Sequence, residues 1–334
     1  MSGLGRRIAN RFAAPYVREI TDRVAEVKGH TERIERRVED ARTHLQEVDE
    51  AVHRDLREAL DGLVAAGEGT DAQLAKVRRM LRHMDDETVA NRRRLYALRE
   101  SEEYELAYTE PDPLVSFVLP TYTRWEKLRD VALPSILGQT HANVEAVVVG
   151  DQAPPETAAA VSALGDDRVR YYNRTVRGPY PEDPAVRWYM VGSPPYNDAL
   201  SLVRGRWIVG MGDDDAVRPE FAEVLLAAAR EGRFENCYGH HRVVYPAGEE
   251  LVVGSFPPKR GEFVTQAAIY HAGLRFFQMN LADPIYEEPN DWSLCRRMMD
   301  AGVRYGMIDA VICDKYESRY QKHSDWEQGI PEVD

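Results

Sequence analysis

The chain has 334 residues, of which 43% are hydrophobic and 30% charged, and its net charge at pH 7 is −13. This length fits one large domain or two of ordinary size, with a substantial buried core. The acidity is concentrated in residues 111–334, which carry 23 Lys or Arg against 33 Asp or Glu, so this part is a poor nucleic-acid binder because phosphate contacts need a basic surface.

Segments that would export the chain or anchor it in a membrane are missing from the sequence pattern. No apolar stretch approaches the roughly 20 residues of a membrane span, and the basic N-terminus lacks the apolar core of a secretory signal. Three widely spaced cysteines, Cys237, Cys295 and Cys313, form no metal-binding spacing and indicate reduced, buried thiols. We expect a cytoplasmic protein, with peripheral binding at the inner membrane face as an alternative.

The first third of the chain carries a heptad pattern. Apolar or small residues alternate in steps of four and three at Ile20, Val24, Val27, Ile34, Val38, Ala41, Leu45, Val48 and Val52, and a second seam runs from Leu74 to Leu98. The glycines within residues 66–71 separate the two seams. The pattern predicts a helical coiled-coil region over residues 1–110, either an antiparallel hairpin or a parallel homo-oligomer, and its narrow apolar seam requires a partner surface.

The pattern changes after the stiff linker Pro111-Asp112-Pro113. Short apolar runs predict buried strands at 115–119, 144–149, 169–172 and 207–211, and helical spacing predicts helices at 125–137, 157–164, 196–203 and 220–229. Strands alternating with helices predict an α/β domain with a mostly parallel, twisted sheet and helices on both faces. This domain is expected to cover residues 114–334.

Polar residues follow three of the predicted strands, at the edge where ligands bind in open α/β sheets. They are Pro120, Thr121 and Tyr122 after the first strand, Asp151 after the second, and Asp213, Asp214 and Asp215 after the fourth. An Asp after a strand is most often the N-cap of the next helix. Three adjacent carboxylates repel one another and favour a bound cation, although a solvated acidic turn is the simpler alternative.

The order of these motifs resembles the family 2 glycosyltransferases, which are inverting enzymes with a GT-A fold. The matching segments are Val-Ser-Phe-Val-Leu-Pro-Thr-Tyr at 115–122, Leu-Pro-Ser-Ile-Leu-Gly-Gln-Thr at 133–140, Val-Val-Val-Gly-Asp at 147–151, Asn197, Arg-Gly-Arg-Trp-Ile at 204–208, and Pro219 after the aspartates. The resemblance implies that residues 114–219 bind a nucleotide sugar and that 220–334 hold the acceptor part and the C-terminal segment. It assigns Pro120, Thr121, Tyr122, Asp151, Asn197 and Asp213 to the nucleotide sugar.

The resemblance also implies a divalent cation, Mn²⁺ or Mg²⁺, bound through a DxD motif. In this chain Gly212 stands where the family's first Asp is expected, and Tyr196-Asn197-Asp198-Ala199 replaces the usual Arg-Asn-x-Gly. By register, Asp214 is assigned to the metal and Asp213 to the ribose, with Asp215 a close alternative metal ligand. His323, in a segment resembling the family's closing Tyr-Arg-x-His, is assigned to the metal or the diphosphate; a surface histidine is the commoner explanation.

Inverting transfer needs a general base that takes the proton of the acceptor hydroxyl. The segment Glu-Glu-Pro-Asn-Asp-Trp at 287–292 resembles the acidic segment in which the family places that base. The resemblance assigns this role to Asp291, with Glu288 in reserve. The alternative is that Asn290 or Asp291 only caps the helix predicted at 292–301.

The sequence therefore predicts a metal-dependent inverting glycosyltransferase that uses a nucleoside-diphosphate sugar, with a UDP-sugar favoured. The acceptor is undefined among glycans, lipid-linked carriers, proteins and small natural products. A nucleotidyltransferase is a weaker alternative, because residues 120–124 contain no glycine for a phosphate-binding loop. A third alternative is an inactive, glycosyltransferase-like binding protein organised by its coiled coil.

Overall fold

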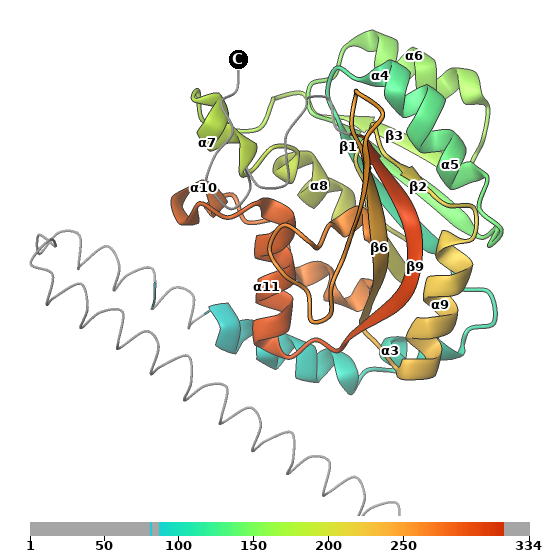
Figure 1. Cartoon of the computed structure of the whole chain (residues 1–334), viewed down its shortest axis with the longest axis vertical. Coiled ribbons are helices and arrows are strands. Elements are labelled where there is room, and N and C mark those ends of the chain that lie inside the picture. The colour runs from blue at the N-terminus through green and yellow to red at the C-terminus, as the bar shows by residue number, and fades with distance from the viewer. Residues whose placement is uncertain (1–80, 82–86, 317–334) are drawn as a thin grey trace, which may run out of the picture. The chain divides into compact units, whose positions relative to one another are not determined.

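A computed structural model gives the fold of the chain (Figure 1). It describes Leu81 and residues 87–316. The chain divides into two units, Met1–Arg82 and His83–Asp334, and the described residues from 87 onward belong to the second. The predicted seams up to residue 80, the break at 66–71 and His323 lie outside the described residues. Within the described ranges, no helix is long and apolar enough to cross a membrane.

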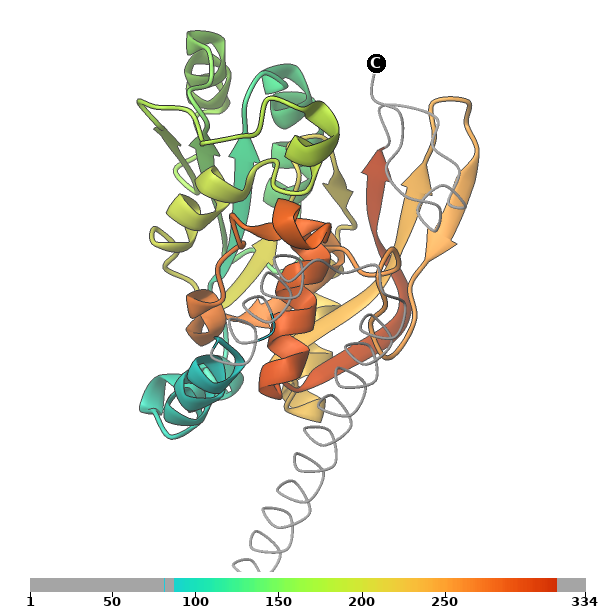
Figure 2. The same ribbon diagram turned by 90° about the vertical axis from the view of Figure 1, so that its left-hand side faces the viewer.

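Nine strands of residues 87–316 form one curled, largely parallel sheet (Figure 2). Their order is β3-β2-β1-β4-β8-β6-β9-β5, with β7 paired to β6. The bounds are β1 Val115–Thr121, β2 Val144–Gly150, β3 Val169–Asn173, β4 Trp207–Gly210, β5 Ala216–Val217, β6 Asn236–Val244, β7 Glu250–Val253, β8 Ala268–His271 and β9 Tyr305–Tyr316. The predicted mixed α/β architecture is confirmed.

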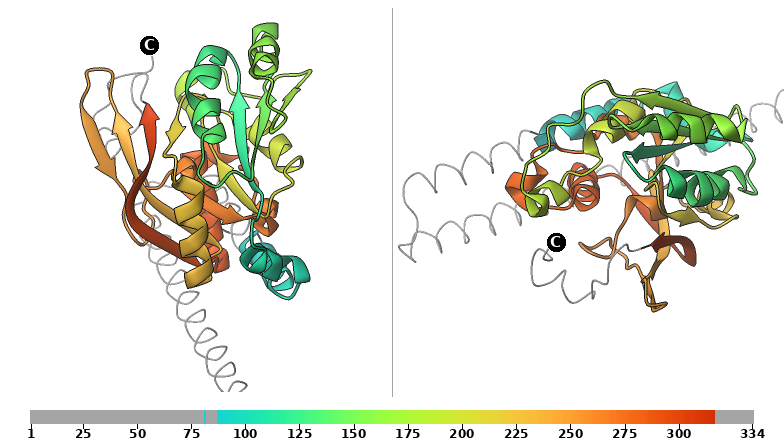
Figure 3. Two further views of the ribbon diagram at one scale, coloured as in Figure 1. Left: turned by 90° about the vertical axis from the view of Figure 1, so that its right-hand side faces the viewer. Right: turned by 90° about the horizontal axis from the view of Figure 1, so that it is seen from above.

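The sheet has two parallel groups joined by one antiparallel strand. β3, β2, β1 and β4 run parallel, β6 and β9 pair in parallel, and β8 lies antiparallel between β4 and β6. Figure 3 shows β9 bending strongly along the second group. Every residue of β2 is buried, as are six of the seven residues of β1. Strands buried on both faces read as continuous apolar runs, which is why the sequence indicated them clearly.

Helices cover both faces of the first group of strands. Side chains of β1 alternate between two cores, since Phe117 packs with Phe221 in one and Val118 packs with Tyr196 and Leu294 in the other. The helices are α3 Glu102–Thr109, α4 Trp125–Lys127, α5 Leu133–Leu137, α6 Pro155–Leu164, α7 Pro184–Trp188, α8 Ser193–Leu200, α9 Phe221–Gly232, α10 Asp283–Tyr286 and α11 Asn290–Ala301, with a π-helical turn at Leu128–Ala132 and 3₁₀ turns at Thr265–Ala267 and Ala272–Phe276. Residues 87–99 are also helical.

The helical segment 87–109 packs onto the sheet. Arg99 forms a two-pronged ion pair with Glu235, at 2.7 and 2.8 Å, and the Glu235 carboxylate is fully buried. The Trp207 indole N–H donates to the Ala107 carbonyl at 3.0 Å. These residues were predicted to lie in the coiled-coil region that ends at 110, whereas in the structure they belong to the same unit as the sheet.

Candidate functional site

The carboxyl ends of β1, β2 and β4 meet at one edge of the sheet. These strands are parallel neighbours, with Thr121 level with Gly150 and Val118 level with Gly210. Beyond the strands, the Asp151 N–H donates to the Thr121 carbonyl at 2.8 Å. Ligands of open α/β sheets bind beyond this edge. The structure therefore brings the three predicted strand ends together.

Asp213 links the end of β1 to the turn that follows β4. Its Oδ2 accepts a hydrogen bond of 2.8 Å from Thr121 Oγ1, and the residue is 8% exposed. Burial, and then the negative charge of Asp214, raises the pKa of Asp213 to about 6, against the opposing effects of Arg124 and Thr121. Loss of water disfavours a charged carboxylate unless donors or cations replace it. Asp213 would therefore be stabilised by an additional positive charge.

Asp214 forms an ion pair with an arginine of the β1 turn. Arg124 Nη1 lies 2.5 Å from Asp214 Oδ2 and 3.5 Å from Asp213 Oδ1. The Arg124 side chain is 52% exposed, so it reaches over the two carboxylates from the solvent side. Arg124 was not among the predicted site residues. Its position in the sequence could have indicated this role, because it is a basic residue three positions after Thr121, in a turn expected to face three aspartates.

Asp215 is held in a different way from its two neighbours. Its Oδ2 accepts from Gln266 Nε2 at 3.0 Å, and its Oδ1 accepts from the Tyr316 N–H at 3.0 Å. The residue is buried. Because both oxygens already accept hydrogen bonds within the fold, Asp215 is poorly placed to be a metal ligand. Its contacts tie the acidic turn to the end of β9.

Gly212, the departure from the expected motif, has a steric explanation. A Cβ at this position would lie 2.8 Å from Asp215 Oδ2 and 3.3 Å from Asp214 Oδ1. Any side chain would push the carboxylates out of their present places. Glycine at this position thus leaves room for the Asp214 and Asp215 carboxylates as they lie in the turn.

Asp151 is buried and fixes the loop after β3. Its Oδ1 accepts from Arg174 Nη1 at 2.7 Å and from the Gly178 N–H at 3.0 Å. The Tyr180 hydroxyl also bonds to this carboxylate, and burial followed by that bond raises the pKa of Tyr180. These three partners were not predicted. Only the position of Arg174 could have been inferred, because the pairing of β3 with β2 brings this residue, just after β3, next to Asp151.

Tyr122 and Pro120 lie at the rim of this edge. The Arg177 guanidinium is 4.0 Å from the centre of the Tyr122 ring, and Tyr122 is 38% exposed. Pro120 is half-buried and lies against Gly192. A Cβ added at Gly192 would be 3.4 Å from the Pro120 Cγ. Arg177 thus covers one face of the Tyr122 ring, which was predicted to contact the nucleotide.

Asn197 lies in α8 and clamps a backbone segment. Its side-chain Nδ2 donates to the Met279 carbonyl at 2.9 Å, and its Oδ1 accepts from the Met279 N–H at 2.8 Å. Both ends of the amide are therefore used to position the loop before α10. A contact of Asn197 with a nucleotide sugar stays a prediction.

The two predicted base residues flank the start of α11. Asp291 Oδ1 accepts from the Trp292 N–H at 2.7 Å, while burial raises the pKa of Asp291 and nearby Lys315 opposes that effect. The helix begins at Asn290, two residues earlier than predicted, and its N-cap is Pro289. Asp291 is therefore a first-turn carboxylate rather than the N-cap.

Glu288 is engaged in an ion pair. Both of its oxygens accept from Arg296, with the shortest distance 2.8 Å, and its side chain is 16% exposed. A carboxylate held by a bidentate guanidinium is a weaker proton acceptor than one without such a partner. Of the two residues, Asp291 has the environment better suited to a base.

Asp291 and the acidic turn both lie near the end of β9. Lys315 is close enough to Asp291 to lower its pKa, and the next residue, Tyr316, donates its N–H to Asp215. Two consecutive residues of one strand thus connect the beginning of α11 to the turn after β4. This arrangement gathers carboxylates from distant parts of the sequence around one strand end.

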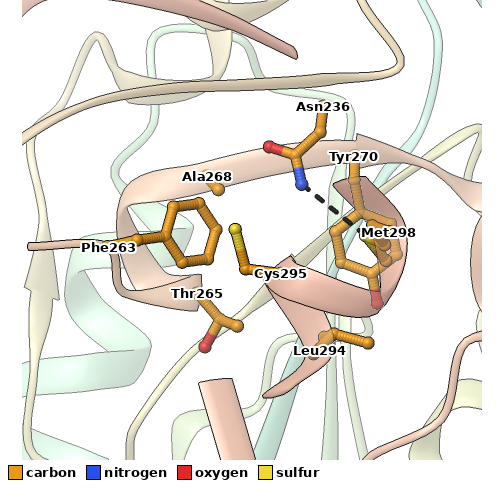
Figure 4. Close-up of a pocket in the computed structure, with 8 residues that line it drawn as sticks. All are labelled: Asn236, Phe263, Thr265, Ala268, Tyr270, Leu294, Cys295 and Met298. Atoms are coloured by element: carbon orange, nitrogen blue, oxygen red, sulfur yellow. Dashed lines mark hydrogen bonds between the residues drawn. The ribbon is translucent and has the colours of Figure 1, made fainter. Parts of the chain in front are cut away.

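A separate small cavity lies inside the domain (Figure 4). Its volume of about 10 Å³ suffices for about one water molecule. It is lined by Asn236, Phe263, Thr265, Ala268, Tyr270, Leu294, Cys295 and Met298, none of which was predicted as a site residue. All three cysteines are free and buried, as predicted. The cavity is too small for a nucleotide or a sugar.

A divalent cation would have two carboxylates available in the acidic turn. Within residues 87–316, no three His, Cys, Asp or Glu side chains are clustered to hold a metal. Mg²⁺ and related ions are commonly held by one or two carboxylates together with water and substrate phosphates. Asp213 and Asp214 fit such a site, since each would be stabilised by the cation's charge. Asp215, whose two oxygens accept hydrogen bonds from Gln266 and Tyr316, is less suited to it.

Comparison with known proteins relates the chain to glycosyltransferases. No family model matches it. It is 31% identical over 118 residues to Escherichia coli K12 WcaA, named as a colanic acid biosynthesis glycosyl transferase, covering 35% of this chain and 38% of WcaA. It is 25% identical over 146 residues to the Escherichia coli UDP-Glc:alpha-D-GlcNAc-diphosphoundecaprenol beta-1,3-glucosyltransferase WfgD, covering 43% of this chain and 51% of WfgD.

Among solved structures, the chain resembles S. aureus TarS 1–349 in complex with UDP-GlcNAc, with a TM-score of 0.49 and 16% sequence identity. The match covers 63% of this chain and 60% of TarS. The chain spans about half or less of the two curated relatives. It is thus similar in sequence to proteins named as glycosyltransferases over about two fifths of its own length.

Proposed function

We propose that the chain is a glycosyltransferase of family 2 with a GT-A fold, which transfers a sugar from a nucleoside-diphosphate sugar to an acceptor hydroxyl with inversion. The observation that carries this proposal is the buried Asp213 beside Asp214, held by Thr121 where the carboxyl ends of β1 and β4 meet. Two adjacent carboxylates at this edge suit a cation that carries a diphosphate. The similarity to WcaA and WfgD supports sugar transfer as the chemistry.

A uridine diphosphate sugar is the favoured donor. The name of WfgD specifies UDP-Glc as that enzyme's donor, and the relatedness of the two sequences supports the same nucleotide here. Asp151, buried beneath the loop of Arg174 and Tyr180, supplies a carboxylate that can accept a hydrogen bond from a base N–H. Tyr122 and Pro120 would flank the nucleoside.

The metal of this proposal would be held by Asp213 and Asp214. When bound, Mn²⁺ or Mg²⁺ would stabilise the negative charge that develops on the departing diphosphate. Thr121 keeps the Asp213 carboxylate oriented toward the edge of the sheet. Asp215, tied to Gln266 and Tyr316, keeps the turn in place beneath them. The role of His323 stays an expectation from the resemblance.

Asp291 would remove the proton from the acceptor hydroxyl. Its raised pKa makes it a stronger base than an ordinary surface carboxylate. The Trp292 N–H, which donates to Oδ1 at 2.7 Å, fixes the carboxylate's orientation at the start of α11. The acceptor oxygen then attacks the anomeric carbon as the bond to the diphosphate breaks, which inverts the configuration at that carbon.

The test is a thermal-shift screen of the full chain against UDP, GDP, CDP and dTDP, each with and without Mn²⁺. A ligand that binds the folded chain raises its Tm by mass action. We expect UDP with Mn²⁺ to stabilise the wild type and to have no effect on Asp214→Asn. Asp130→Asn, which removes an exposed carboxylate paired with Arg129, is the matched control and should respond like the wild type. No stabilisation by any nucleotide would remove the basis for the transferase proposal.

A further inference from the structure

Arg124 lies where a cation would bind in the proposed site. Its guanidinium is 2.5 Å from Asp214 and 3.5 Å from Asp213, so one positive charge spans both carboxylates. The two aspartate side chains are 11% and 18% exposed, whereas that of Arg124 is 52% exposed. Two largely buried negative groups thus share one positive charge, carried by a side chain that comes from the solvent side.

The position of Arg124 in the chain makes this pairing local to the site. Arg124 follows Thr121 by three residues and precedes α4, and Thr121 itself donates to Asp213. The end of β1 therefore contacts the acidic turn twice, once through a buried hydroxyl and once through an exposed guanidinium. The buried contact positions Asp213, while the exposed one can break without disturbing the core.

We propose that Arg124 is a displaceable counter-cation. It offsets part of the negative charge of Asp213 and Asp214 until a divalent cation and a nucleoside diphosphate bind, and it then moves to pair with the diphosphate. This inference rests on the proposed function, because it requires a metal and a diphosphate at this turn. It adds a residue whose contacts change between the unliganded and the nucleotide-bound protein.

Physical considerations favour an exchange over a fixed brace. An ion pair with a half-exposed arginine is weak, since water screens it and the long side chain must be ordered. A divalent cation competes for the same two carboxylates with twice the charge. Once displaced, the guanidinium has a phosphate within its reach, and its planar donors match phosphate oxygens in a two-pronged contact.

The exchange predicts opposite effects on two binding reactions. In the full chain, Arg124→Gln removes the competing charge, so Mn²⁺ alone should bind about threefold more tightly, the size of one partly screened ion pair. The same variant loses a phosphate contact, so UDP at saturating Mn²⁺ should bind about tenfold more weakly. Free Mn²⁺ is measured by electron paramagnetic resonance, and UDP binding is measured by calorimetry.

Two further variants serve as controls. Arg129→Gln removes a positive charge five residues after Arg124, at an arginine that pairs with exposed Asp130. It should change neither the Mn²⁺ affinity nor the UDP affinity. Arg124→Lys keeps the charge and should restore the Mn²⁺ affinity of the wild type while recovering only part of the UDP affinity. Thermal denaturation of each variant without ligand reports whether the acidic turn stays folded.

The outcomes separate this inference from the proposed function. Unchanged or weaker Mn²⁺ binding in Arg124→Gln overturns the exchange, whatever the UDP affinity, and a fall in Tm with weaker Mn²⁺ binding would identify Arg124 as a brace. If the wild type binds neither Mn²⁺ nor UDP, the proposed function is wrong and the role of Arg124 is lost with it. If the wild type binds both and Arg124→Gln matches it, only the inference about Arg124 is wrong.

Discussion

The Thr121 hydroxyl donates a 2.8 Å hydrogen bond to the Asp213 carboxylate. This bond joins the end of β1 to the turn after β4, although the two residues lie 92 positions apart in the sequence. Asp213 is also 8% exposed and next to Asp214, so its charge is costly in the absence of a bound cation. The hydrogen bond from Thr121 therefore holds the Asp213 carboxylate, which destabilises the unliganded fold, in the place where a bound cation would stabilise it.

Replacement of Asp213 by Asn should therefore stabilise the fold at neutral pH. The pKa of Asp213 is raised to about 6 in the folded chain, against 3.8 for an ordinary Asp. The folded state then binds the proton more tightly, so this group's contribution to stability falls as pH rises from about 4 to about 6 and stays low above that. We expect Asp213→Asn to raise Tm by about 3 °C at pH 8 and to have little effect at pH 4.

The measurement is thermal unfolding of both proteins in the same buffers from pH 4 to pH 8. Asp130→Asn is the control, because Asp130 is 56% exposed and its pKa is lowered by its hydrogen bond to Arg129. The pKa of Asp130 is shifted downward rather than upward, so Asp130→Asn should not raise the Tm at pH 8. A Tm gain for Asp213→Asn that is equal at pH 4 and pH 8 would contradict the assigned pKa.

Asp214 and Asp215 should respond differently to the same substitution. Asp214 pairs with half-exposed Arg124, so Asp214→Asn should cost less than about 1 kcal/mol of stability and abolish Mn²⁺-dependent UDP binding. In Asp215→Asn, an amide N–H₂ would face either Gln266 Nε2 or the Tyr316 N–H, both of which are donors. We expect a loss of about 2 kcal/mol, the cost of a buried polar group left without a partner.

Urea denaturation of the two variants checks the stability difference, and Mn²⁺ titration in the presence of UDP checks the functional one. Residual Mn²⁺ affinity in Asp215→Asn at permissive temperature, together with none in Asp214→Asn, assigns the metal to Asp214. The reverse result would restore Asp215 as the ligand, which was the close alternative of the sequence analysis.

The sequence predicted the four strands of the first parallel group, of which β1, β2 and β4 are almost fully buried. All four strands begin at the predicted residues. Continuous apolar runs leave little ambiguity in β1, β2 and β4, whereas β3 contains Arg170 and is partly exposed. The helices begin earlier than predicted where prolines occupy the first turn, as Pro155 does in α6 and Pro194 in α8. Proline lacks the N–H that the first turn does not need, so it starts helices there rather than ending them.

The strand-end positions of the site were predictable, but their partners were not. Asp151 and Asp213 follow buried strands, which places them by the topology alone. Arg124, Arg174 and Tyr180 lie in loops whose direction depends on contacts formed only in the folded chain. The short strands β5, β7 and β8, of two to four residues, were not predicted, and neither were the longer strands β6 and β9.

Arg174 should influence which base is bound. It contacts Asp151 at 2.7 Å and Asp198 at 2.8 Å, and it belongs to the loop that covers Asp151. A carboxylate accepts a hydrogen bond from the N3–H of uracil, whereas cytosine has an acceptor at that position. We expect Arg174→Gln to reduce the preference for UDP over CDP by about fivefold, because a hydrogen bond to a charged group is then less well oriented.

Calorimetric dissociation constants of both nucleotides give this preference directly. Arg168→Gln removes another arginine near β3, one that pairs with Asp166 at 2.8 Å, and should leave the preference unchanged. A loss of affinity that is equal for UDP and CDP would mean that Arg174 acts on the phosphates or on the fold rather than through Asp151.

The helical segment 87–109 should contribute to the stability of the domain. Glu235 is fully buried and accepts hydrogen bonds from Arg99, the Tyr104 hydroxyl and the Arg304 N–H. Arg99→Ala removes the closer of the two ion-pair partners of this carboxylate, leaving only Arg304 at 3.6 Å, and should cost about 3 kcal/mol. Glu110→Gln breaks the exposed pair with Arg206 and should cost less than about 1 kcal/mol. Urea denaturation of the full chain measures both, and equal losses would contradict the role given to Glu235.

Asp291 should set the acidic limb of the pH–rate profile if it is the general base. A base must be ionised to accept a proton, so kcat/KM falls as pH drops below its pKa. Since burial raises the pKa of Asp291, that limb should lie above the range of an ordinary carboxyl. Asp291→Asn should remove the limb and lower kcat by about 10²- to 10⁴-fold, the usual contribution of a general base.

Glu288→Gln distinguishes the two predicted bases. Glu288 pairs with Arg296 at 2.8 Å, so its replacement should lower Tm but leave the acidic limb in place. Nucleotide binding to Asp291→Asn, measured by calorimetry, should match the wild type, because the base acts on the acceptor and not on the donor. If the limb instead disappears in Glu288→Gln and persists in Asp291→Asn, Glu288 is the base, and the carboxylate of Asp291 serves the first turn of α11, where negative charge is stabilised by the helix N-terminus.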